Sequence, residues 1–407
     1  MRDRALRVIE ECNSIAAMTE EPGRITRRYL TPPMRSVHAH LRERMNGLGM
    51  RVEIDAVGNL RGLWAQHESP KRRLIIGSHL DTVPNAGAFD GVLGVVIALE
   101  WVLLAQEMTL AVPIEVIGFS EEEGVRYGVP FIGSRAVAGC FDSALLRLQD
   151  TDGISLEQAI RDFGLDPLDI HRAAITGDEL GFVEVHIEQG PVLDAEHLSV
   201  AAVTSIVGQT RGTLAFTGHA NHPGTTPMHL RQDALAGAAE WISAVEEVAL
   251  QTEKLVATVG RINAEPNTGN VIPGAVEVTL DCRHADDAVR VVAVNDLLAQ
   301  AGAISKRRGL TMEWAEQLNQ PAVPMDARLT ALMADSIREA GLPAKTMTSG
   351  AGHDAMIMAS RVPATMLFLR SPGGISHDPS ESVLVEDIEA SLHVARGFLE
   401  RLAADVR

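Results

Sequence analysis

Residues 74–106 read LIIGSHLDTVPNAGAFDGVLGVVIALEWVLLAQ, and this stretch carries the pattern on which the prediction of the fold class rests. Its opening residues, Leu74–Ser78, form a short apolar run that predicts a buried strand. Val92–Gln106 is apolar over a length that suits a buried helix. A strand followed at once by a helix is the repeating unit of an α/β sheet. His79 ends the strand and Asp90 precedes the helix, which is where such sheets gather functional residues.

The same alternation continues on both sides of this stretch. Helical periodicity predicts four further helices, over Leu6–Met18, Met34–Leu48, Ala327–Ala340 and Glu386–Ala404. Apolar runs predict further strands over Ile114–Phe119, Phe182–His186, Val200–Val207 and Thr365–Leu369. We therefore expect an α/β catalytic domain with a mixed, mostly parallel sheet and helices on both faces.

The pattern changes after Gly208. The elements that follow are a strand over Thr210–Phe216, a helix over Asp233–Thr252, strands over Leu255–Ile262 and Val276–Arg283, a helix over Asp286–Arg308 and a strand over Leu310–Glu316. The order βαββαβ is typical of a small ferredoxin-like domain. We therefore predict that residues 208–322 form an inserted domain that splits the α/β domain into residues 1–207 and 323–407.

Composition limits the possible functions. The chain has 407 residues, 46% of them hydrophobic, and a net charge of −18 without a basic stripe, which argues against a nucleic-acid partner. The longest apolar stretch, Val92–Ala105, is interrupted by Glu100 and is too short to span a bilayer, so no membrane role is expected. The N-terminus mixes both charges and does not resemble a signal peptide. The three cysteines form no C-x-x-C pair, as expected for reduced thiols in a cytoplasmic protein.

Five residues of metal-ligand type stand at predicted strand ends or in the turns that follow them. Each has an ordinary structural interpretation: His79 and His186 could hydrogen-bond a loop, Asp90 could cap the helix, the run Glu121–Glu123 could be a solvated charge run, and His377 could face solvent. Together they provide what two divalent ions that share one carboxylate would need. This combination predicts a hydrolase that activates water with metal ions.

The motifs around these residues resemble those of the M20 superfamily of dinuclear-metal amidohydrolases. The resemblance is to the branch that holds allantoate amidohydrolases, N-carbamoyl-L-amino-acid hydrolases and β-ureidopropionases, and it spans essentially the whole chain. The motifs that carry it are GNLRG, GSHLDTV, GAFDGVLG, EEEGVRYG, GSRAVAG, HIEQGPVL, GHANHPGTTPM, NVIPG, LDCRH, GAGHDA and GISHDPSE.

The resemblance implies roles for the candidate site residues. One ion would be held by His79, Asp90 and His186, and the other by Asp90, Glu123 and His377, so that Asp90 bridges the two. Glu122 would be the general base, although Glu121 is a second candidate within the EEEG run. Asp81 would not bind an ion itself but would orient the ring of His79. The ions would be Zn or Mn, with Co or Ni as alternatives.

The inserted domain would supply the remaining contacts as a lid and a dimerisation domain. His222 matches the histidine that completes the site across a dimer interface and stabilises the oxyanion. Asn270 and Arg283 match substrate binders, Gln209 is a further candidate on this domain, and Gly350 is a further candidate on the catalytic domain. Arg283 would clamp a substrate carboxylate, which suits its planar guanidinium.

These matches imply a small substrate with a ureido group and a carboxylate. Residues 19–41 and the sequence SPGGISH look more like allantoate amidohydrolases, which would release ammonia and carbon dioxide from allantoate to give ureidoglycine. The alternatives are an N-carbamoyl-L-amino-acid hydrolase or a β-ureidopropionase, and, in another class, a non-catalytic metal-binding relative. The sequence has no G-x-S-x-G, no GxxxxGK[ST] and no HExxH.

Overall fold

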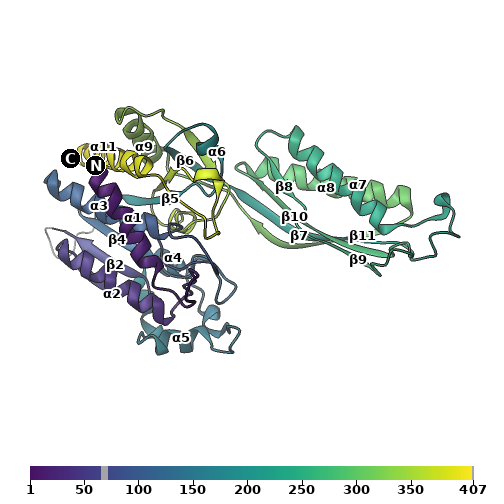
Figure 1. The fold of residues 1–407 in the computed structure, drawn as a ribbon, viewed down its shortest axis with the longest axis horizontal. Helices are drawn as coiled ribbons and strands as arrows, with labels where there is room; N and C mark the ends of the chain where they lie inside the picture. Colours follow the sequence, from purple (N-terminus) through teal and green to yellow (C-terminus); the bar gives the residue numbers. More distant parts are fainter. Residues whose placement is uncertain (66–71, 406–407) are drawn as a thin grey trace. The chain divides into compact units, whose positions relative to one another are not determined.

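The computed structural model describes residues 1–65 and 72–405. The chain divides into two compact units, one formed by Met1–Thr204 with Met325–Arg407 and the other by Ser205–Pro324 (Figure 1). The second unit is a single continuous stretch of chain that interrupts the first between Thr204 and Met325. The insertion expected from the sequence, residues 208–322, lies close to these boundaries.

The first unit is built on a mixed sheet that has nine strands within the described residues, although its two-residue edge strand, Val323–Pro324, falls at the end of the second unit. Its strands are β1 (Arg51–Ile54), β2 (Leu60–Trp64), β3 (Leu74–His79), β4 (Ile114–Phe119), β5 (Gly181–Ile187), β6 (Val200–Ile206), β12 (Val323–Pro324), β13 (Thr346–Ser349) and β14 (Ala364–Leu369). The order is β1-β2-β4-β3-β5-β14-β6-β12, with β13 paired to β6. The central strands β4, β3, β5 and β14 are parallel, while β2 is antiparallel to β1 and β4, and β6 is antiparallel to β14 and β12. The predicted mixed, mostly parallel sheet is confirmed.

Helices cover both faces of this sheet. They are α1 (Arg2–Ala16), α2 (Pro32–Gly47), α3 (Val92–Glu107), α4 (Ile132–Ala138), α5 (Leu156–Asp162), α6 (Val192–Ala195), α9 (Ala327–Glu339), α10 (Asp354–Met358) and α11 (Val385–Asp405). Alternate residues of β5 face opposite layers. Val183 and Val185 join the apolar core with α3 and α11, whereas Glu184 on the other face accepts a hydrogen bond from Ala355 of α10. Short 3₁₀ turns, η1 (Ser143–Arg147), η2 (Pro167–Ala173) and η4 (Pro372–Gly374), complete the unit.

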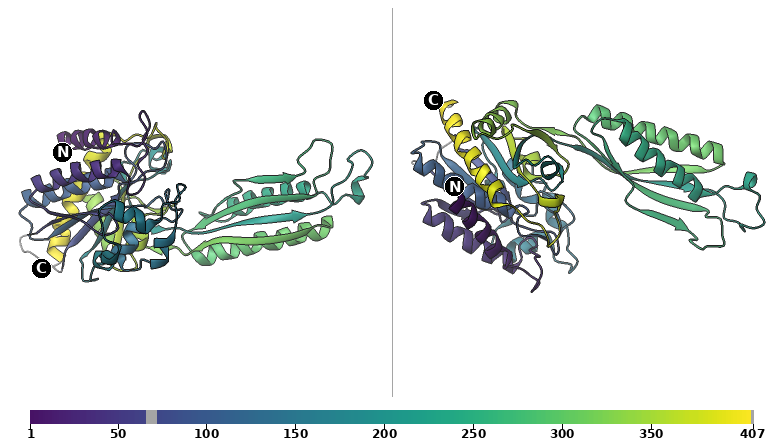
Figure 2. Two further views of the ribbon diagram at one scale, coloured as in Figure 1. Left: turned by 90° about the horizontal axis from the view of Figure 1, so that it is seen from below. Right: turned by 45° about the horizontal axis from the view of Figure 1, so that its top comes forward.

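The second unit has the predicted ferredoxin-like order. Its elements are β7 (Gly208–Thr217), η3 (Met228–Leu230), α7 (Ala234–Gln251), β8 (Val256–Thr258), β9 (Ile262–Glu265), β10 (Ala275–His284), α8 (Asp287–Arg308) and β11 (Thr311–Gln320). The sheet order is β11-β7-β10-β8, with β9 also paired to β10. Both long helices cover one face of this sheet (Figure 2), where Phe216, Trp241 and Leu297 are fully buried.

One predicted strand of this unit is wrong in its extent. Residues 255–262 were expected to form a single strand, but the structure has two short strands, β8 and β9, separated at Gly260. The Thr279 hydroxyl accepts a hydrogen bond from the backbone N–H of Arg261 at 3.0 Å, in place of a regular ladder contact. A glycine within a strand pattern is typical of such an interruption.

Within the described residues, one helix, α8, is long and apolar enough to cross a membrane by length and composition. Core helices of ordinary globular domains meet the same test. Here α8 packs against β7, β10 and β11, and it carries the buried Arg290, which is paired with Asp287. The helix is therefore part of the core of the second unit.

His38 on α2 makes stability depend on pH. The side chain is 2% exposed, its ring packs edge-on against Phe163, and neither ring nitrogen has a hydrogen-bond partner among the described residues. Burial, together with Arg42 and Arg35, lowers the pKa of His38 to about 3. Because an unfolded chain protonates this histidine near pH 6.5, the folded protein loses stability as the pH falls from about 6.5 toward 3.

We predict that His38→Leu flattens this part of the pH profile. Between pH 6 and 4, His38 should lower the free energy of unfolding of wild type by up to about 1.4 kcal/mol per pH unit. The variant lacks this contribution. Urea unfolding of chelator-treated protein at several pH values measures the difference. The exposed His393 provides a matched control, since His393→Leu should follow wild type. Equal slopes for His38→Leu and wild type would contradict the prediction.

Candidate metal centre

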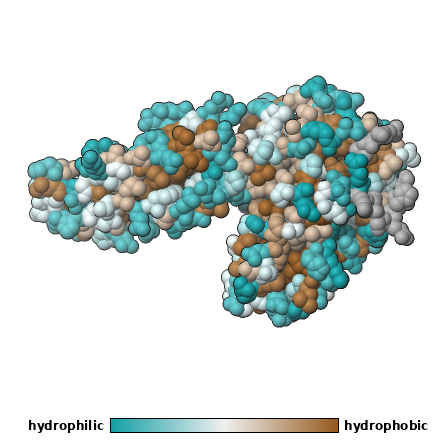
Figure 3. All heavy atoms as spheres, turned by 180° about the vertical axis from the view of Figure 1, so that it is seen from behind, coloured by the Kyte–Doolittle hydropathy of each residue, from teal (hydrophilic) through white to brown (hydrophobic). Residues whose placement is uncertain are grey.

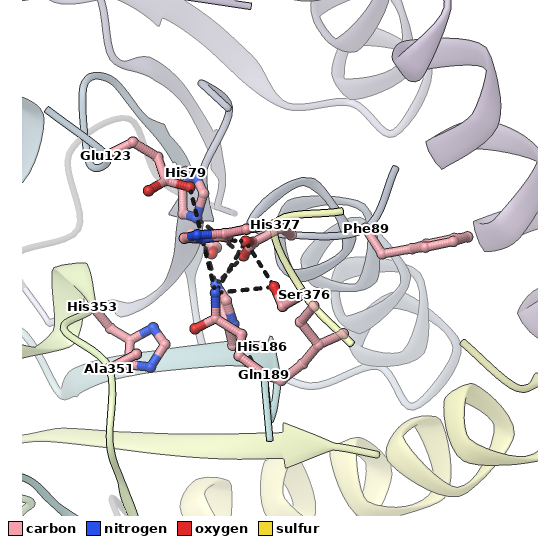
Figure 4. Close-up of polar contacts among 12 residues, drawn as sticks. His79, Phe89, Glu123, His186, Gln189, Ala351, His353, Ser376 and His377 are labelled. Atoms are coloured by element: carbon pink, nitrogen blue, oxygen red, sulfur yellow. Dashed lines mark hydrogen bonds and ion pairs between the residues drawn. The ribbon is translucent and has the colours of Figure 1, made fainter. Parts of the chain in front are cut away.

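The carboxyl ends of the parallel strands bring the candidate ligands together. His79 is the last residue of β3, His186 lies near the end of β5, and Glu123 follows β4. His377 lies in the segment after β14, beyond η4. Because β4, β3, β5 and β14 are parallel neighbours, these ends meet at one edge of the sheet, as Figure 4 shows for His79, Glu123, His186 and His377.

Asp90 lies at the centre of this group. The residue after it, Gly91, has a φ of +69°, and a Cβ atom built there would lie 2.4 Å from the His79 ring. Glycine therefore lets the turn pass against the imidazole. The alternative role of Asp90 as a helix cap does not apply, because α3 has Gly91 at its N-cap and no side-chain cap hydrogen bond.

The two oxygens of Asp90 face two different sets of side chains. Oδ1 lies 3.2 Å from His186 Nε2 and 3.7 Å from His79 Nε2. Oδ2 lies 3.1 Å from His377 Nε2, which is itself 3.4 Å from Glu123 Oε1. The predicted ligands thus form two groups of metal-binding size, His79 with Asp90 and His186, and Glu123 with Asp90 and His377.

In the first group, the atoms with free lone pairs point toward one common position, as they would around a cation. His79 Nδ1 lies 2.9 Å from the backbone carbonyl of Asp81, and His186 Nδ1 lies 2.9 Å from that of Ile187. A carbonyl only accepts, so both rings donate from Nδ1 and turn Nε2 toward Asp90. Asp90 Oδ1 is buried and has no hydrogen-bond partner within the described chain. Acceptor atoms gathered around one point in this way suit a divalent metal ion.

Asp81 supports the site differently from the expectation. Its carboxylate was expected to orient His79, but His79 Nδ1 bonds the backbone carbonyl of Asp81 and lies 3.9 Å from the carboxylate. The carboxylate oxygens instead each accept a hydrogen bond of 3.1 Å, one from the backbone N–H of Glu122 and one from that of Glu123. Asp81 therefore links the loop after β3 to the loop after β4.

The two candidate bases have different surroundings. Glu122 is buried, and its carboxylate forms a group of metal-binding size with His79 and Glu123. Glu121 adopts a left-handed backbone conformation with a φ of +53°, and its Oε1 accepts hydrogen bonds from the backbone N–H groups of Arg126 and Tyr127. The Glu121 carboxylate thus closes its own turn, and this geometry favours Glu122 as the base.

The electrostatics of the cluster favour positive charge. Burial raises the pKa of Asp90, but the neighbouring His377, His79 and His186 side chains outweigh burial and hold that pKa well below its usual range. The contacts with Asp90 and Glu123 raise the pKa of His377 to about 10. Burial raises the pKa of Glu122 well above its usual range. Cation binding at such a cluster is expected to displace protons.

Several residues at the site were not identified from the sequence. Gln189 Nε2 donates to Asp90 Oδ2 at 3.0 Å, and Ser376 Oγ lies 3.2 Å from the same oxygen. The His353 ring lies beside that of His186 (Figure 4), 4.5 Å away. With Glu184 these histidines form a further group of metal-binding size. The period-2 pattern of VEVHIEQ, which places Glu184 and His186 on one face, was an available signal.

The second unit carries four of the predicted substrate binders. Gln209 and Arg283 are directly opposite each other on β7 and β10. The Arg283 guanidinium bonds both carboxylate oxygens of Asp281 at 2.8 Å. His222 and Asn270 are exposed on two loops that meet where the Asn221 carbonyl accepts a hydrogen bond from Ile272. Gly350 belongs to the first unit and follows β13.

Comparisons with known proteins identify the family. The model of peptidase family M20/M25/M40 matches residues 75–401. A probable allantoate deiminase of Oryza sativa is 34% identical over 100% of this chain and 89% of its own, and an N-carbamoyl-L-amino-acid amidohydrolase of Paenarthrobacter aurescens is 35% identical over 98% of both. A crystal structure of a hydantoinase/carbamoylase-family amidase from Burkholderia multivorans aligns with a TM-score of 0.92 at 31% identity over 98% of both chains. The chain therefore belongs to the peptidase family M20/M25/M40.

Proposed function

We propose that this chain is a metal-dependent amidohydrolase that cleaves a C–N bond of a small ureido compound. The observation that carries the proposal is the Asp90 carboxylate, whose oxygens face two separate sets of ligand-type side chains. The donor set suits two divalent ions, Zn or Mn, with Co or Ni as alternatives. Such ions supply Lewis acidity, which polarises a carbonyl group and makes water more acidic.

Glu122 is the residue we assign to proton transfer. Its buried carboxyl group adjoins the ligand cluster, and Asp81 holds its backbone in place. A glutamate with a raised pKa is suited to take a proton from water and to return it to the leaving nitrogen. The carbon of a ureido group is a poor electrophile, so a donor such as His222 would be needed to stabilise the oxyanion.

The substrate that we propose is allantoate, which would yield ammonia, carbon dioxide and ureidoglycine. The N-terminal segment 19–41 and the sequence SPGGISH at 371–377 support this choice. Gln209, Asn270, Arg283 and Gly350 would bind the rest of the substrate, with Arg283 on a carboxylate. An N-carbamoyl-L-amino acid or β-ureidopropionate is the alternative, because a relative named for N-carbamoyl amino acids is equally similar. A non-catalytic metal-binding relative is disfavoured by the presence of Glu122 beside all five ligand-type residues.

We also propose a homodimer formed through the second unit. β8 and β9 lie at an edge of its sheet, and they expose Val256 and Ile262 at 60% and 49%. Apolar side chains on an open edge favour pairing with another chain, and Figure 3 shows hydrophobic surface on this unit.

We propose a cytoplasmic location for the protein. This location accords with the cysteines, since Cys12, Cys140 and Cys282 are all free thiols.

The first prediction for the site concerns the base. Glu122→Gln should lower kcat by about 10²–10⁴-fold, because the amide cannot accept the proton from water, while cation content stays at the wild-type level. Steady-state ammonia release and elemental analysis measure the two quantities. Glu121→Gln is the matched control, since its amide oxygen can still accept the bonds from Arg126 and Tyr127. A fully active Glu122→Gln protein, or loss of activity only in Glu121→Gln, would contradict the assignment.

The second prediction concerns the substrate. Chelator-treated enzyme should release no ammonia from allantoate, and addition of Mn or Zn should restore the reaction. With the cation restored, kcat/KM for allantoate should exceed that for N-carbamoyl-L-amino acids and β-ureidopropionate by at least about tenfold, which corresponds to about 1.4 kcal/mol. The reverse order among these substrates would favour the carbamoyl alternative. Tight cation binding without turnover of any of them would favour the non-catalytic relative.

The third prediction tests whether His222 acts across a dimer. Glu122→Gln and His222→Ala should each be inactive. A mixture of the two, refolded or exchanged together, should recover about a quarter of wild-type activity, because half of the dimers are mixed and each holds one intact site. Size-exclusion chromatography with light scattering establishes the assembly. If His222 acts within its own chain, the mixture stays inactive.

A further inference from the structure

A buried glutamate, Glu381, joins the two chain segments that carry Asp90 and His377. It is 6% exposed. Its Oε1 accepts hydrogen bonds from the backbone N–H groups of Phe89 at 2.9 Å and Asp90 at 3.0 Å. Its Oε2 lies 3.1 Å from Ser376 Oγ, on the residue next to His377. One side chain therefore connects two segments that are 291 positions apart between Glu381 and Asp90.

Ser376 extends this connection to the Asp90 side chain. Its hydroxyl lies 3.2 Å from Asp90 Oδ2, the oxygen that faces His377. A hydroxyl has one proton, so Ser376 can donate to either carboxylate and accepts with its lone pairs. Glu381 thus holds the backbone of Asp90 directly, and the Ser376 hydroxyl lies between Glu381 Oε2 and Asp90 Oδ2.

The chain around Glu381 is shaped to admit it. A Cβ atom built on Gly87 would lie 2.4 Å from both Cβ and Oε1 of Glu381, so the glutamate side chain lies directly against the backbone of residue 87. Gly87 begins the turn that presents Asp90. The close approach therefore fixes that turn against the C-terminal segment.

The second group of ligands needs this support more than the first. The His377 side chain is 48% exposed, against 2% for His79 and 1% for His186, and its backbone has a left-handed φ of +57°. His79 and His186 lie on strands of the central sheet, and each has its ring fixed by a backbone carbonyl. The position of His377 depends on a loop.

We propose that Glu381 is a positioning residue that fixes Asp90 and His377 in one geometry and thereby sets the affinity of the cation bound by Asp90, Glu123 and His377. The inference rests on the proposed metal-dependent function. When Glu381 is removed, only one of the two cations should bind more weakly. The rings of His79 and His186 are still fixed by backbone carbonyls in that variant, so the affinity for the other cation should be retained. Residues that orient ligands from behind typically contribute about 10–100-fold to cation affinity.

The test measures cation binding to the full-length chain and needs no substrate. Wild type and Glu381→Ala are stripped with chelator and titrated with Zn or Mn, and bound cation per chain is determined after dialysis. Wild type should bind two ions. Glu381→Ala should retain one and bind the other about 10–100-fold more weakly. Glu381→Gln should restore both, because its amide oxygen accepts the two backbone hydrogen bonds and its amide group donates to Ser376 Oγ.

Glu179 supplies a matched control at the opposite end of β5. It is also a buried glutamate that accepts bonds from two backbone N–H groups, those of Thr176 and Gly177, and from one hydroxyl. Glu179→Ala should lower the thermal unfolding temperature but leave both cations bound. Ser376→Ala removes the hydroxyl that lies between the Glu381 and Asp90 carboxylates, together with its 3.3 Å hydrogen bond from Gln189 Nε2, so it should weaken binding of the second cation several-fold without a loss of fold.

Each outcome decides the inference. Two cations with unchanged affinities in Glu381→Ala would overturn it, and so would equal losses of cation in Glu381→Ala and Glu179→Ala. If Glu381→Ala does not fold, Ser376→Ala decides, and unchanged affinity there overturns the inference. A wild-type chain that binds fewer than two ions would overturn the two-ion proposal as well. Two ions in wild type together with inactivity on every ureido substrate would leave this inference standing and remove only the substrate assignment.

Discussion

The placement of one carboxylate between two histidines, His186 on one side and His377 on the other, is the constraint on which the site depends. Asp90 reaches that position because Gly91 lets the chain turn against the His79 ring and because α3 begins immediately afterwards. Parallel strands deliver the remaining ligands to the same edge of the sheet. The fold therefore contributes a fixed arrangement of metal-ligand atoms. Divalent ions bound there would supply the Lewis acidity for the reaction.

The interior around this carboxylate is rich in acids. Burial raises the pKa of Glu184 to about 8 and that of Asp354 to about 7, and it also raises the pKa of Asp81. Closely spaced buried carboxylates repel one another unless positive charge lies between them. Divalent ions would offset that repulsion, so metal binding and folding stability are coupled in a site of this kind.

The sequence predicted the parts of the fold that follow from strong local patterns. Buried strands such as Leu74–Ser78 and Ile114–Phe119 are continuous apolar runs, and the long helices have clear periodicity. The hairpin of β1 and β2 was missed because its strands are short and carry Arg51, Glu53 and Arg61. The helix α10 was missed because it has only five residues. Its position depends on Glu184, which is distant in sequence.

For the site, the motif order identified the candidate ligands, and the structure brings all five together. The sequence could not indicate which atoms of Asp81 act, because the choice between its carbonyl and its carboxylate depends on how two loops meet. Glu381 illustrates the same limit. In SHDPSESV it has the appearance of an ordinary surface glutamate, and only the tertiary approach of Gly87 makes it a buried acceptor. The helix and strand patterns are local, whereas these contacts depend on packing.

The way in which the second unit is inserted has a consequence for how such a chain is assembled. The segments that enter and leave it are already neighbours, since Ile206 pairs with Val323 and Gln209 pairs with Gln320. The excursion therefore starts and ends as a two-stranded ladder, and the ends of the long insertion are held together by main-chain hydrogen bonds. The entropic cost of bringing two chain ends together grows with the length of a flexible loop. Here the insertion is folded and its own ladder brings its ends together, so the first unit does not bear the closure cost of a long flexible loop. An insertion connected in this way can vary in size and surface from one relative to another while the sheet that carries the ligands keeps its register.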